Sequence, residues 1–416
     1  MIKADKLPSG VKIVYEKIDE ANSACIGIWI GVGSNCEQDN IAGISHYIEH
    51  MLFKGTDTRT AKQIAEDTDR IGANINAFTS KEATCYHIKA LTNKFSQAVD
   101  IILDMLCNSL FDSKEMKKER NVILEEMSMI EDTPDDYILD LLTAKVLAGS
   151  DLESSIIGTR KSLKNINSDA IKAYMDTNYT KDNIVVAVVG NFDEKELFIK
   201  LDKALSQFGE KQDPRPQNES LIGKRFEDKV KDISQTHLAI GIPGVSFASE
   251  QYYSQAIVND VLGGSMSSRL FQNIREQKGL AYTVYSAAAC YSQIGMFYIY
   301  AGVKLGKAEE ALNAIAFELE KLSKEGISRD DVEVVKQRLK SNYIFSLESM
   351  NSKMYRLGKS TLLLGRPFTP EETMAQIDAV TQTDVEAACI RLGDFNLYSG
   401  VSISKEKLNI KKIMNK

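Results

Sequence analysis

The sequence contains one long unit twice, and this internal repeat limits the possible folds more than any other feature. The stretch "CIGIWIGVGS" in the first half is matched by "THLAIGIPGVS" in the second, and "GISHYIEHMLFKG" is matched by "YYSQAIVNDVLGG". The helical stretch "DSKEMKKERNVILEEMSMIEDT" has its counterpart in "SRDDVEVVKQRLKSNYIFSLES". A repeat of this length indicates duplication, so we expect two similar domains related by a pseudo-twofold axis.

The fold class follows from the mixture of strand and helix patterns in each copy. Apolar runs such as "NIVVAVVGNF" predict buried strands, and helical stretches cover about 93–110 and 112–132. Pro134 ends the second of these, because it disfavours helical geometry at Thr133. Strands and helices therefore alternate, which predicts an α/β or α+β class.

The domain boundaries are set by one polar segment. At 416 residues the chain is too long for a single ordinary core. The segment 209–223 has no periodic apolar face and contains two of the seven prolines, so we interpret it as a linker. We predict an N-terminal domain over 1–208 and a homologous C-terminal domain over 224–416.

The composition argues against several functions. The net charge of −7 disfavours a nucleic-acid binder, since such a protein needs a basic face to offset phosphate. No apolar run has the length of a membrane span, and "MIKADKLPSG" lacks both an apolar signal core and an arginine-rich amphipathic pattern. The six cysteines include no C-x-x-C pair, which predicts reduced thiols. We therefore expect a cytoplasmic protein without nucleic-acid or membrane partners.

Two of the four histidines lie on one predicted helical turn. On a helix His46, Glu49 and His50 share a face, so the imidazoles can bind one Zn²⁺ and the carboxylate can lie beside a water molecule. The order H-x-x-E-H is the inverzincin motif. The corresponding positions of the second copy hold other residues: Ala256, Asn259 and Asp260. Because only the first copy has the histidines, a purely structural role for them is disfavoured.

A catalytic zinc ion needs a third protein ligand and one open position. The remaining histidines, His87 and His237, lie in predicted strands, and we interpret them as ordinary strand residues. The third ligand is then expected to be a carboxylate.

The predicted helix over 112–132 supplies that carboxylate. One of its stripes carries two acids among isoleucines: Glu119, Ile123, Glu126 and Ile130. A buried acid needs a cation or several donors, and a metal would meet that need. Glu126 is the predicted ligand, and Glu119, two turns away, is expected to support the site. Glu125 points about 100° away and is expected to be solvated.

These residues resemble the pitrilysin family of zinc peptidases. The motif His46-x-x-Glu49-His50 is followed 76 positions later by Glu126 inside "ERNVILEEM". "GANINAFTSKEATCY" is similar to the family's substrate-aligning edge strand, and "LGGSMSSRLFQNIREQKGLAYTVYS" to its second-domain signature. The resemblance covers nearly the whole chain. It is strongest to the short bacterial members, and it extends to the processing subunit of mitochondrial processing peptidase.

The resemblance implies a fold and a chemistry. The fold would be α+β, with two homologous α/β domains that each form a mostly antiparallel sheet packed with helices. One Zn²⁺ per chain would be held by His46, His50 and Glu126, with Glu49 as the general base and Glu119 in support. The activity would be endopeptidase cleavage of unfolded peptides or small proteins.

The resemblance also implies substrate contacts and a partner. Asn76 and Ala77 would lie at the working end of the edge strand, and Arg275 and Tyr282 would contact substrate carbonyls. The short family members pair, so a homodimer with composite active sites is expected. The short "GGS" at 263–265 departs from the long glycine-rich loop of the mitochondrial non-catalytic subunit, so presequence recognition is not implied.

Two alternatives remain from other classes. Proteins of this fold also serve as non-catalytic scaffold or partner subunits, which resemble the peptidases in fold alone. A metal-dependent enzyme of different chemistry is the other alternative, and the second-domain signature disfavours it.

Overall fold

The structure is a computed structural model that describes residues 1–210 and 223–414. In these ranges the first sheet has six strands, of which only β2 and β6 pair in parallel. Their order across the sheet is β1 (Ile2–Lys6), β2 (Lys12–Lys17), β6 (Ile184–Gly190), β3 (Ser23–Ile30), β5 (Thr84–Leu91) and β4 (Asn74–Thr79). Strand β4 is therefore an edge strand.

The second sheet repeats this topology. Within the described residues it has five strands, and again a single pair, β7 with β11, is parallel. The order is β7 (Phe226–Val230), β11 (Ser399–Ser404), β8 (Gln235–Gly244), β10 (Gly295–Lys304) and β9 (Ala281–Cys290). Strand for strand this matches β2-β6-β3-β5-β4. The predicted duplication and the mostly antiparallel sheets are confirmed.

The helices divide between two compact units. The first unit holds α1 (Ile44–Leu52), α2 (Ala61–Arg70), α3 (Phe95–Asn108), most of α4 (Ser113–Asp132), α6 (Ser168–Asn178), α7 (Glu194–Leu205) and α11 (Met350–Leu364). The second holds α5 (Pro134–Val146), α8 (Tyr252–Leu262), the π-helix η6 (Phe271–Gln277), α9 (Ala308–Glu325), most of α10 (Arg329–Ser346), most of α12 (Pro370–Ala379), α13 (Gln382–Leu392) and α14 (Ile410–Met414).

The two compact units are not continuous in sequence. The first combines Met1–Met127 and Ser154–Gln217 with Ile344–Pro370, and Ser128–Glu153 belongs to the second. The units therefore differ from the continuous ranges 1–208 and 224–416 by an exchange of two helical segments. Most of the predicted linker, residues 211–222, lies outside the described residues.

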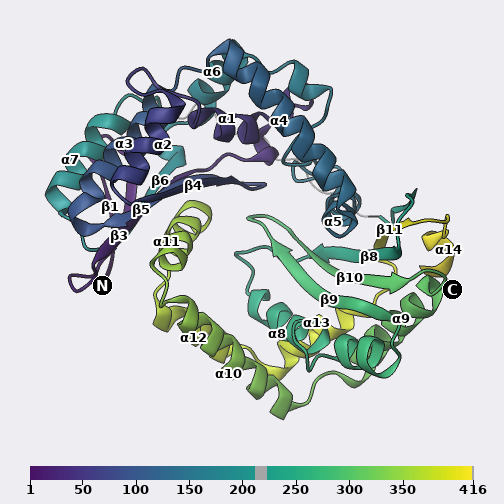
Figure 1. Ribbon diagram of the computed structural model, residues 1–416. Coiled ribbons are helices and arrows are strands. Elements are labelled where there is room, and N and C mark those ends of the chain that lie inside the picture. The colour runs from purple at the N-terminus through teal and green to yellow at the C-terminus, as the bar shows by residue number, and fades with distance from the viewer. Residues whose placement is uncertain (211–222, 415–416) are drawn as a thin grey trace. The chain divides into compact units, whose positions relative to one another are not determined.

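The exchanged helix α11 covers one face of the first sheet (Figure 1). Met354 and Leu357 on this helix pack against Trp29 and Val185 of the sheet. The helix comes very close to the strands, because a side chain at Gly358 would collide with the Trp29 indole. Strand β6 is consequently buried on both faces, which explains its continuous apolar sequence.

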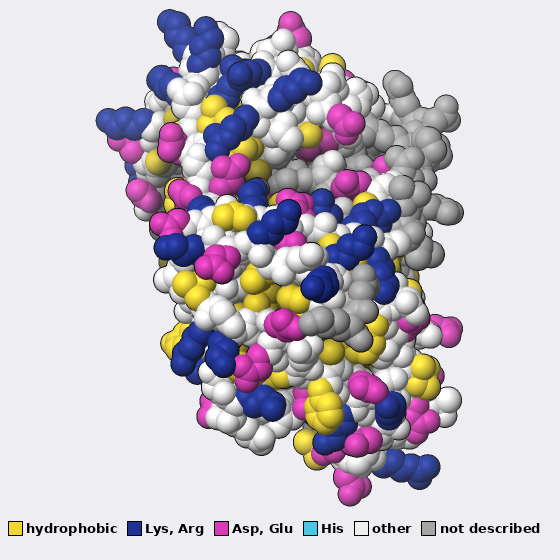
Figure 2. All heavy atoms as spheres, turned by 90° about the vertical axis from the view of Figure 1, so that its right-hand side faces the viewer, with side chains coloured by type: hydrophobic (Ala, Val, Ile, Leu, Met, Phe, Trp, Pro, Cys, Tyr) yellow, Lys and Arg dark blue, Asp and Glu magenta, His cyan; other side chains and the backbone are white. Residues whose placement is uncertain are grey.

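The exchanged helix α5 covers the second sheet in the same way (Figure 1). It begins at Pro134, and Thr133 before it has φ −108° and ψ 88°, so the predicted interruption after α4 is confirmed. Ile138 and Leu142 are fully buried against Ala239 and Val401 of the sheet. No helix in the described ranges is long and apolar enough to cross a membrane. On the face drawn in Figure 2, Lys and Arg side chains lie among Asp and Glu side chains.

Candidate metal centre

Helix α1 packs its apolar side into the core, which leaves its polar side less buried. Its buried apolar residues are Ile44, Tyr47, Ile48, Met51 and Leu52. The helix follows Gly43, whose φ of 92° lies in the left-handed region. A side chain at this position would also collide with the Ile157 carbonyl, so glycine is required on both counts.

The side chain of Glu37 caps α1 from outside the helix. Its carboxylate accepts hydrogen bonds from the backbone N–H groups of Gly43 at 2.5 Å and Ser45 at 2.8 Å. N–H groups at a helix start have no partner within the helix, so this contact satisfies them. In addition, the Tyr47 hydroxyl donates to the carbonyl of Met116 and joins α1 to α4.

Helices α1 and α4 bring three candidate ligands together. Nε2 of His46 lies 3.7 Å from one carboxylate oxygen of Glu126, and Nε2 of His50 lies 3.6 Å from the other. The ligand atoms of all three residues are within 4.8 Å of one another. Glu125 is exposed, so the stripe on α4 places Glu126 with the histidines and leaves its neighbour in solvent.

These separations suit a single metal ion. In a tetrahedral site with metal–ligand distances of about 2.1 Å, ligand atoms lie roughly 3.4 Å apart. Two imidazole nitrogens and one carboxylate, with a fourth position open, are the donors of a catalytic zinc site. Nδ1 of His46 is buried without a hydrogen-bond partner, whereas its Nε2 faces Glu126. In the described part of the chain, this is the one group of three metal-binding side chains at such distances.

The electrostatics of the centre favour a neutral imidazole and a basic carboxylate. Burial and the neighbouring His50 lower the pKa of His46 to about 4, which leaves the ring able to bind a metal. Burial raises the pKa of Glu49, while a hydrogen bond from the Thr79 hydroxyl at 2.6 Å opposes the rise. A carboxylate with a raised pKa accepts a proton more readily, as a general base must.

Glu119 lies between a histidine and a lysine. One of its oxygens is 3.0 Å from Nδ1 of His50, and the other is 2.5 Å from Nζ of Lys54. A carboxylate can only accept, so Nδ1 of His50 donates and its Nε2 keeps a free lone pair on the side of Glu126. The Glu119 side chain is only 8% exposed, and the ammonium group of Lys54 compensates its charge.

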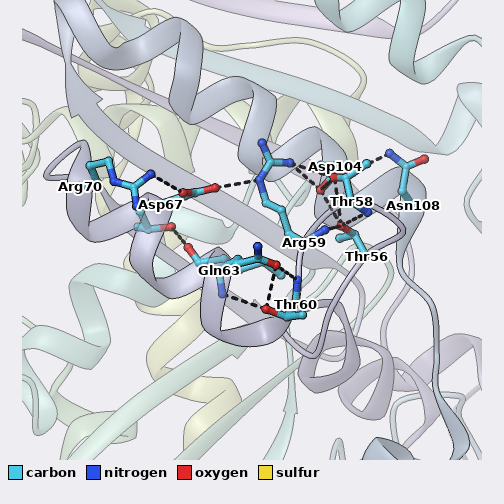
Figure 3. A network of polar contacts seen from close by, with 11 residues as sticks. Thr56, Thr58, Arg59, Thr60, Gln63, Asp67, Arg70, Asp104 and Asn108 are labelled. Carbon is cyan, nitrogen blue, oxygen red and sulfur yellow. Dashed lines mark hydrogen bonds and ion pairs between the residues drawn. The ribbon is translucent and has the colours of Figure 1, made fainter.

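The loop after Lys54 is tied to α3 by a hydrogen-bond network centred on Asp104 (Figure 3). One oxygen of Asp104 accepts from the Thr56 hydroxyl at 2.7 Å, the Thr58 hydroxyl at 2.9 Å and the Arg59 guanidinium at 2.6 Å. Burial raises the pKa of Asp104, but these hydrogen bonds outweigh it and the pKa is lowered overall. The ionised, buried carboxylate of Asp104 thus holds the loop that follows α1.

The Glu37 cap predicts a pH-dependent stability. Burial raises the pKa of Glu37 from 4.5 to about 7, against the backbone N–H groups that lower it. The folded state then binds this proton more tightly than the unfolded state, so the stabilisation is complete below pH 4.5 and is lost as the pH rises through 7. A Glu37→Gln variant should therefore gain stability relative to the unaltered chain between about pH 5 and pH 8, by on the order of 3 kcal/mol.

Denaturant unfolding of both metal-free proteins at the two pH values measures this difference. Glu66→Gln, which changes an exposed carboxylate on α2, is the matched control and should show little pH-dependent difference. If Glu37→Gln instead loses stability relative to the unaltered chain as the pH rises, the N–H groups at the start of α1 outweigh burial and the assignment is wrong.

The second unit lacks the centre at the equivalent place. With an offset of 210 positions, five of the six buried positions of α1 are also buried in α8. Asp260 occupies the position that corresponds to His50, and it forms an ion pair with Arg338. The amide oxygen of Asn259, in the place of Glu49, accepts a hydrogen bond from the Ser286 hydroxyl at 2.8 Å.

The predicted substrate residues lie in two places. Asn76 and Ala77 lie on the edge strand β4, and the Asn76 side chain accepts a hydrogen bond from the backbone N–H of Ala77. Arg275 and Tyr282 lie together in the second unit, with the guanidinium 5.3 Å from the centre of the tyrosine ring. Tyr282 is 74% exposed and the Arg275 side chain 38%, so both groups are accessible from solvent.

Sequence reasoning missed three residues that contact this centre or its helix. Thr79 had no sequence signal, because it meets Glu49 only through the tertiary fold. Glu37 is close to α1 in sequence, but a contact from its side chain to the backbone N–H groups at the start of α1 follows no helical or strand period. Lys54 was weakly indicated by the sequence. It follows His50 by four positions, and residues four apart are neighbours on a helix.

Comparison with known proteins agrees with this arrangement. Residues 12–160 match the description of the insulinase family (peptidase family M16), and residues 165–339 match that of the peptidase M16 inactive domain. The chain is 42% identical over 387 residues to YmxG of Bacillus subtilis, named an uncharacterized zinc protease, covering 91% of this chain and 93% of the relative. It is 33% identical over 401 residues to SCO5738 of Streptomyces coelicolor, which has the same description, covering 93% and 86%.

Solved structures share the whole fold. A protease from Helicobacter pylori superimposes with a TM-score of 0.90 at 21% identity, covering 97% of this chain and 99% of that one. A peptidase M16 inactive domain from Pseudomonas fluorescens gives 0.90 at 19% identity, covering 98% of each chain. Two similar domains, the first with a His-His-Glu group that could hold a metal ion, and relatives named zinc proteases together define the class as a metalloprotease. The chain belongs to the insulinase family, peptidase family M16.

Proposed function

We propose that this protein is a zinc-dependent endopeptidase that cleaves unfolded peptides or small proteins. The observation that carries the proposal is the cluster of His46, His50 and Glu126, whose ligand atoms lie within 4.8 Å of one another. The carboxylate of Glu49, on the same helix as the histidines, interacts electrostatically with His50 and Glu126. The names of the bacterial relatives as zinc proteases support the same chemistry. Zinc bound by these three residues would supply Lewis acidity toward a water molecule and the scissile carbonyl.

Glu49 has the role of general base in this proposal. Its carboxylate takes a proton from the attacking water and passes it to the leaving amine, so that one side chain serves both steps. The hydrogen bond from Thr79 orients that carboxylate and joins it to the end of strand β4. The base is thereby tied to the strand on which the substrate is proposed to bind.

Strand β4 is the proposed binding place for the peptide. As an edge strand of the first sheet it has one side without a neighbouring strand in the described residues, so an extended peptide can add there. Binding through backbone groups tolerates many sequences, which suits an endopeptidase for unfolded chains. Asn76 and Ala77 would lie along the peptide, and Arg275 with Tyr282 would hold a substrate carbonyl and its developing negative charge.

A non-catalytic subunit of the same fold is the alternative. A scaffold has no need for two histidines and a glutamate brought together, and this chain has that group, with Glu49 on the same helix as the histidines. Measuring the zinc content together with cleavage of a quenched fluorescent peptide library distinguishes the two. A chain that binds zinc but cleaves no member of the library would contradict the peptidase proposal.

We also propose that the active form is a homodimer with composite sites, as the short family members imply. Arg275 and Tyr282 would then act on substrate held at the partner's zinc. Mixing a Glu49→Gln chain with a Tyr282→Phe chain, each nearly inactive alone, should restore about a quarter of the activity at random assortment and about half if every dimer is mixed. This follows because one of the two sites in each mixed dimer keeps both groups.

Differently tagged chains would show in the same sample that subunits exchange. A mixture of two Glu49→Gln preparations is the control and should stay inactive. If exchange is shown and the Glu49→Gln and Tyr282→Phe mixture also stays inactive, the two residues do not act across subunits.

A further inference from the structure

We propose that Lys54 is a positioning residue for the metal centre, which acts by holding Glu119 so that His50 presents Nε2 to the metal. The inference deepens the proposed function and depends on zinc binding at this centre. The contacts form one chain: Lys54 Nζ lies 2.5 Å from one oxygen of Glu119, and the other oxygen lies 3.0 Å from Nδ1 of His50. Nε2 of the same ring is the atom that faces Glu126.

The orientation of His50 depends on Glu119. An imidazole can bind a metal through either nitrogen, and the hydrogen bond made by one nitrogen decides which is free. Glu119 must therefore keep one oxygen on Nδ1 and cannot rotate toward solvent. Lys54 prevents this rotation by occupying the second oxygen, and its charge offsets the cost of a carboxylate that is only 8% exposed.

Lys54 is itself held on both sides. Its backbone N–H donates to the carbonyl of Met51 at the end of α1, at 3.0 Å. Two residues later Thr56 joins the network around Asp104 that ties the loop to α3 (Figure 3). The Lys54 side chain is 30% exposed. Because its side chain is largely covered, Lys54 has fewer rotamers to lose on pairing than a lysine on an exposed helix face.

The duplicated unit supplies an internal comparison. With the offset of 210 that aligns α1 with α8, Lys54 corresponds to Gly264. Matching α4 with α10 from the start of the repeat places Glu119 on Val335, and both positions are buried. The unit without metal ligands thus has neither the lysine nor the acid, although the surrounding fold is retained. The pair occurs together with the metal ligands and is not a requirement of the fold.

Zinc affinity measured by competition with a chelator tests the proposal on the full chain. Lys54→Met should weaken zinc binding by about 10-fold or more, as loss of an outer-shell contact commonly does. Lys54→Arg keeps the cation and should stay within about threefold of the unaltered chain. Lys118→Met is the matched control, because Lys118 pairs with Glu115 at 2.6 Å on the exposed side of α4, the helix that carries Glu119. It should leave zinc affinity unchanged.

A double substitution identifies the route of the effect. If Lys54 acts through Glu119, Lys54→Met should cause no further loss in a Glu119→Gln background. An equal loss in both backgrounds would overturn the proposal, as would normal zinc affinity of Lys54→Met itself. If Lys54→Met fails to fold, Lys54→Gln provides the same comparison with a neutral polar side chain. No zinc uptake by the unaltered chain would overturn the proposed function and this inference together.

The ring of His50 gives a readout that needs neither metal nor activity. The chain has four histidines, so ¹⁵N-histidine labelling yields a spectrum simple enough to assign by substitution. In the metal-free protein, at a pH where the rings are neutral, His50 should carry its proton on Nδ1. In Lys54→Met it should become a mixture of both tautomers, and Lys54→Arg should restore the single form. An unchanged tautomer in Lys54→Met would show that the lysine does not orient this ring.

Discussion

Glu49→Gln is expected to reduce peptide hydrolysis by at least about 100-fold while the protein keeps its zinc. The three proposed ligands are unchanged by this substitution, so the metal should stay bound. The glutamine amide oxygen can still accept the hydrogen bond that Thr79 donates to the carboxylate, so the side chain should keep its place. What the amide cannot do is accept a proton from water. The loss should therefore appear in the rate of turnover and not in metal content or folding.

Turnover of a quenched peptide and zinc content should be measured on the same preparations. Glu66→Gln makes the same chemical change at an exposed site on α2 and should have full activity. Equal turnover by Glu49→Gln and the unaltered chain would remove Glu49 from the mechanism. A variant that has lost its zinc would instead place Glu49 among the groups that hold the metal.

Glu126→Gln is expected to lower the affinity for zinc by more than about 100-fold, since it alters the proposed third ligand itself and not an outer contact. An amide oxygen is neutral and is a much weaker ligand for zinc than a carboxylate. Glu125→Gln is the matched control, because it is the same substitution one residue earlier, on the exposed side of α4. It should bind zinc as the unaltered chain does.

Zinc per chain after dialysis against a graded series of chelator concentrations measures both variants. Circular dichroism on the same samples shows whether α4 is retained. If Glu125→Gln loses zinc and Glu126→Gln keeps it, the third ligand is one residue earlier than proposed and the helix is rotated relative to the structure.

The candidate ligands could be predicted because each depends on a short-range regularity. His46 and His50 are neighbours on one helix face at any position in a fold, since the spacing of an α-helix places residues four apart together. The same rule separates Glu126 from Glu125 on α4, and the structure has the first near the histidines and the second exposed. Helical spacing cannot predict that α1 and α4 contact each other. That contact was expected from the family resemblance.

The helix exchange could not be predicted from periodicity. The apolar stripe of α11, which includes Met354 and Leu357, shows that one face must be buried, but any apolar sheet face would satisfy it. Because the chain is continuous, α11 was expected in the second domain. In the structure it packs on the first sheet instead. The sequence of β6 is apolar at every position, which indicates two covered faces without showing which helix covers the second.

By itself the sequence determined the duplication, the two sheets with their helices and the residue types of a metal centre, because these follow from local periodicity and from similarity between the two halves. Tertiary structure alone decided which distant groups support that centre. Thr79 meets Glu49, and Lys54 reaches Glu119, only after the chain has closed loops of many residues. Such contacts depend on packing between elements and leave no period in the sequence, so they are visible only in the folded molecule.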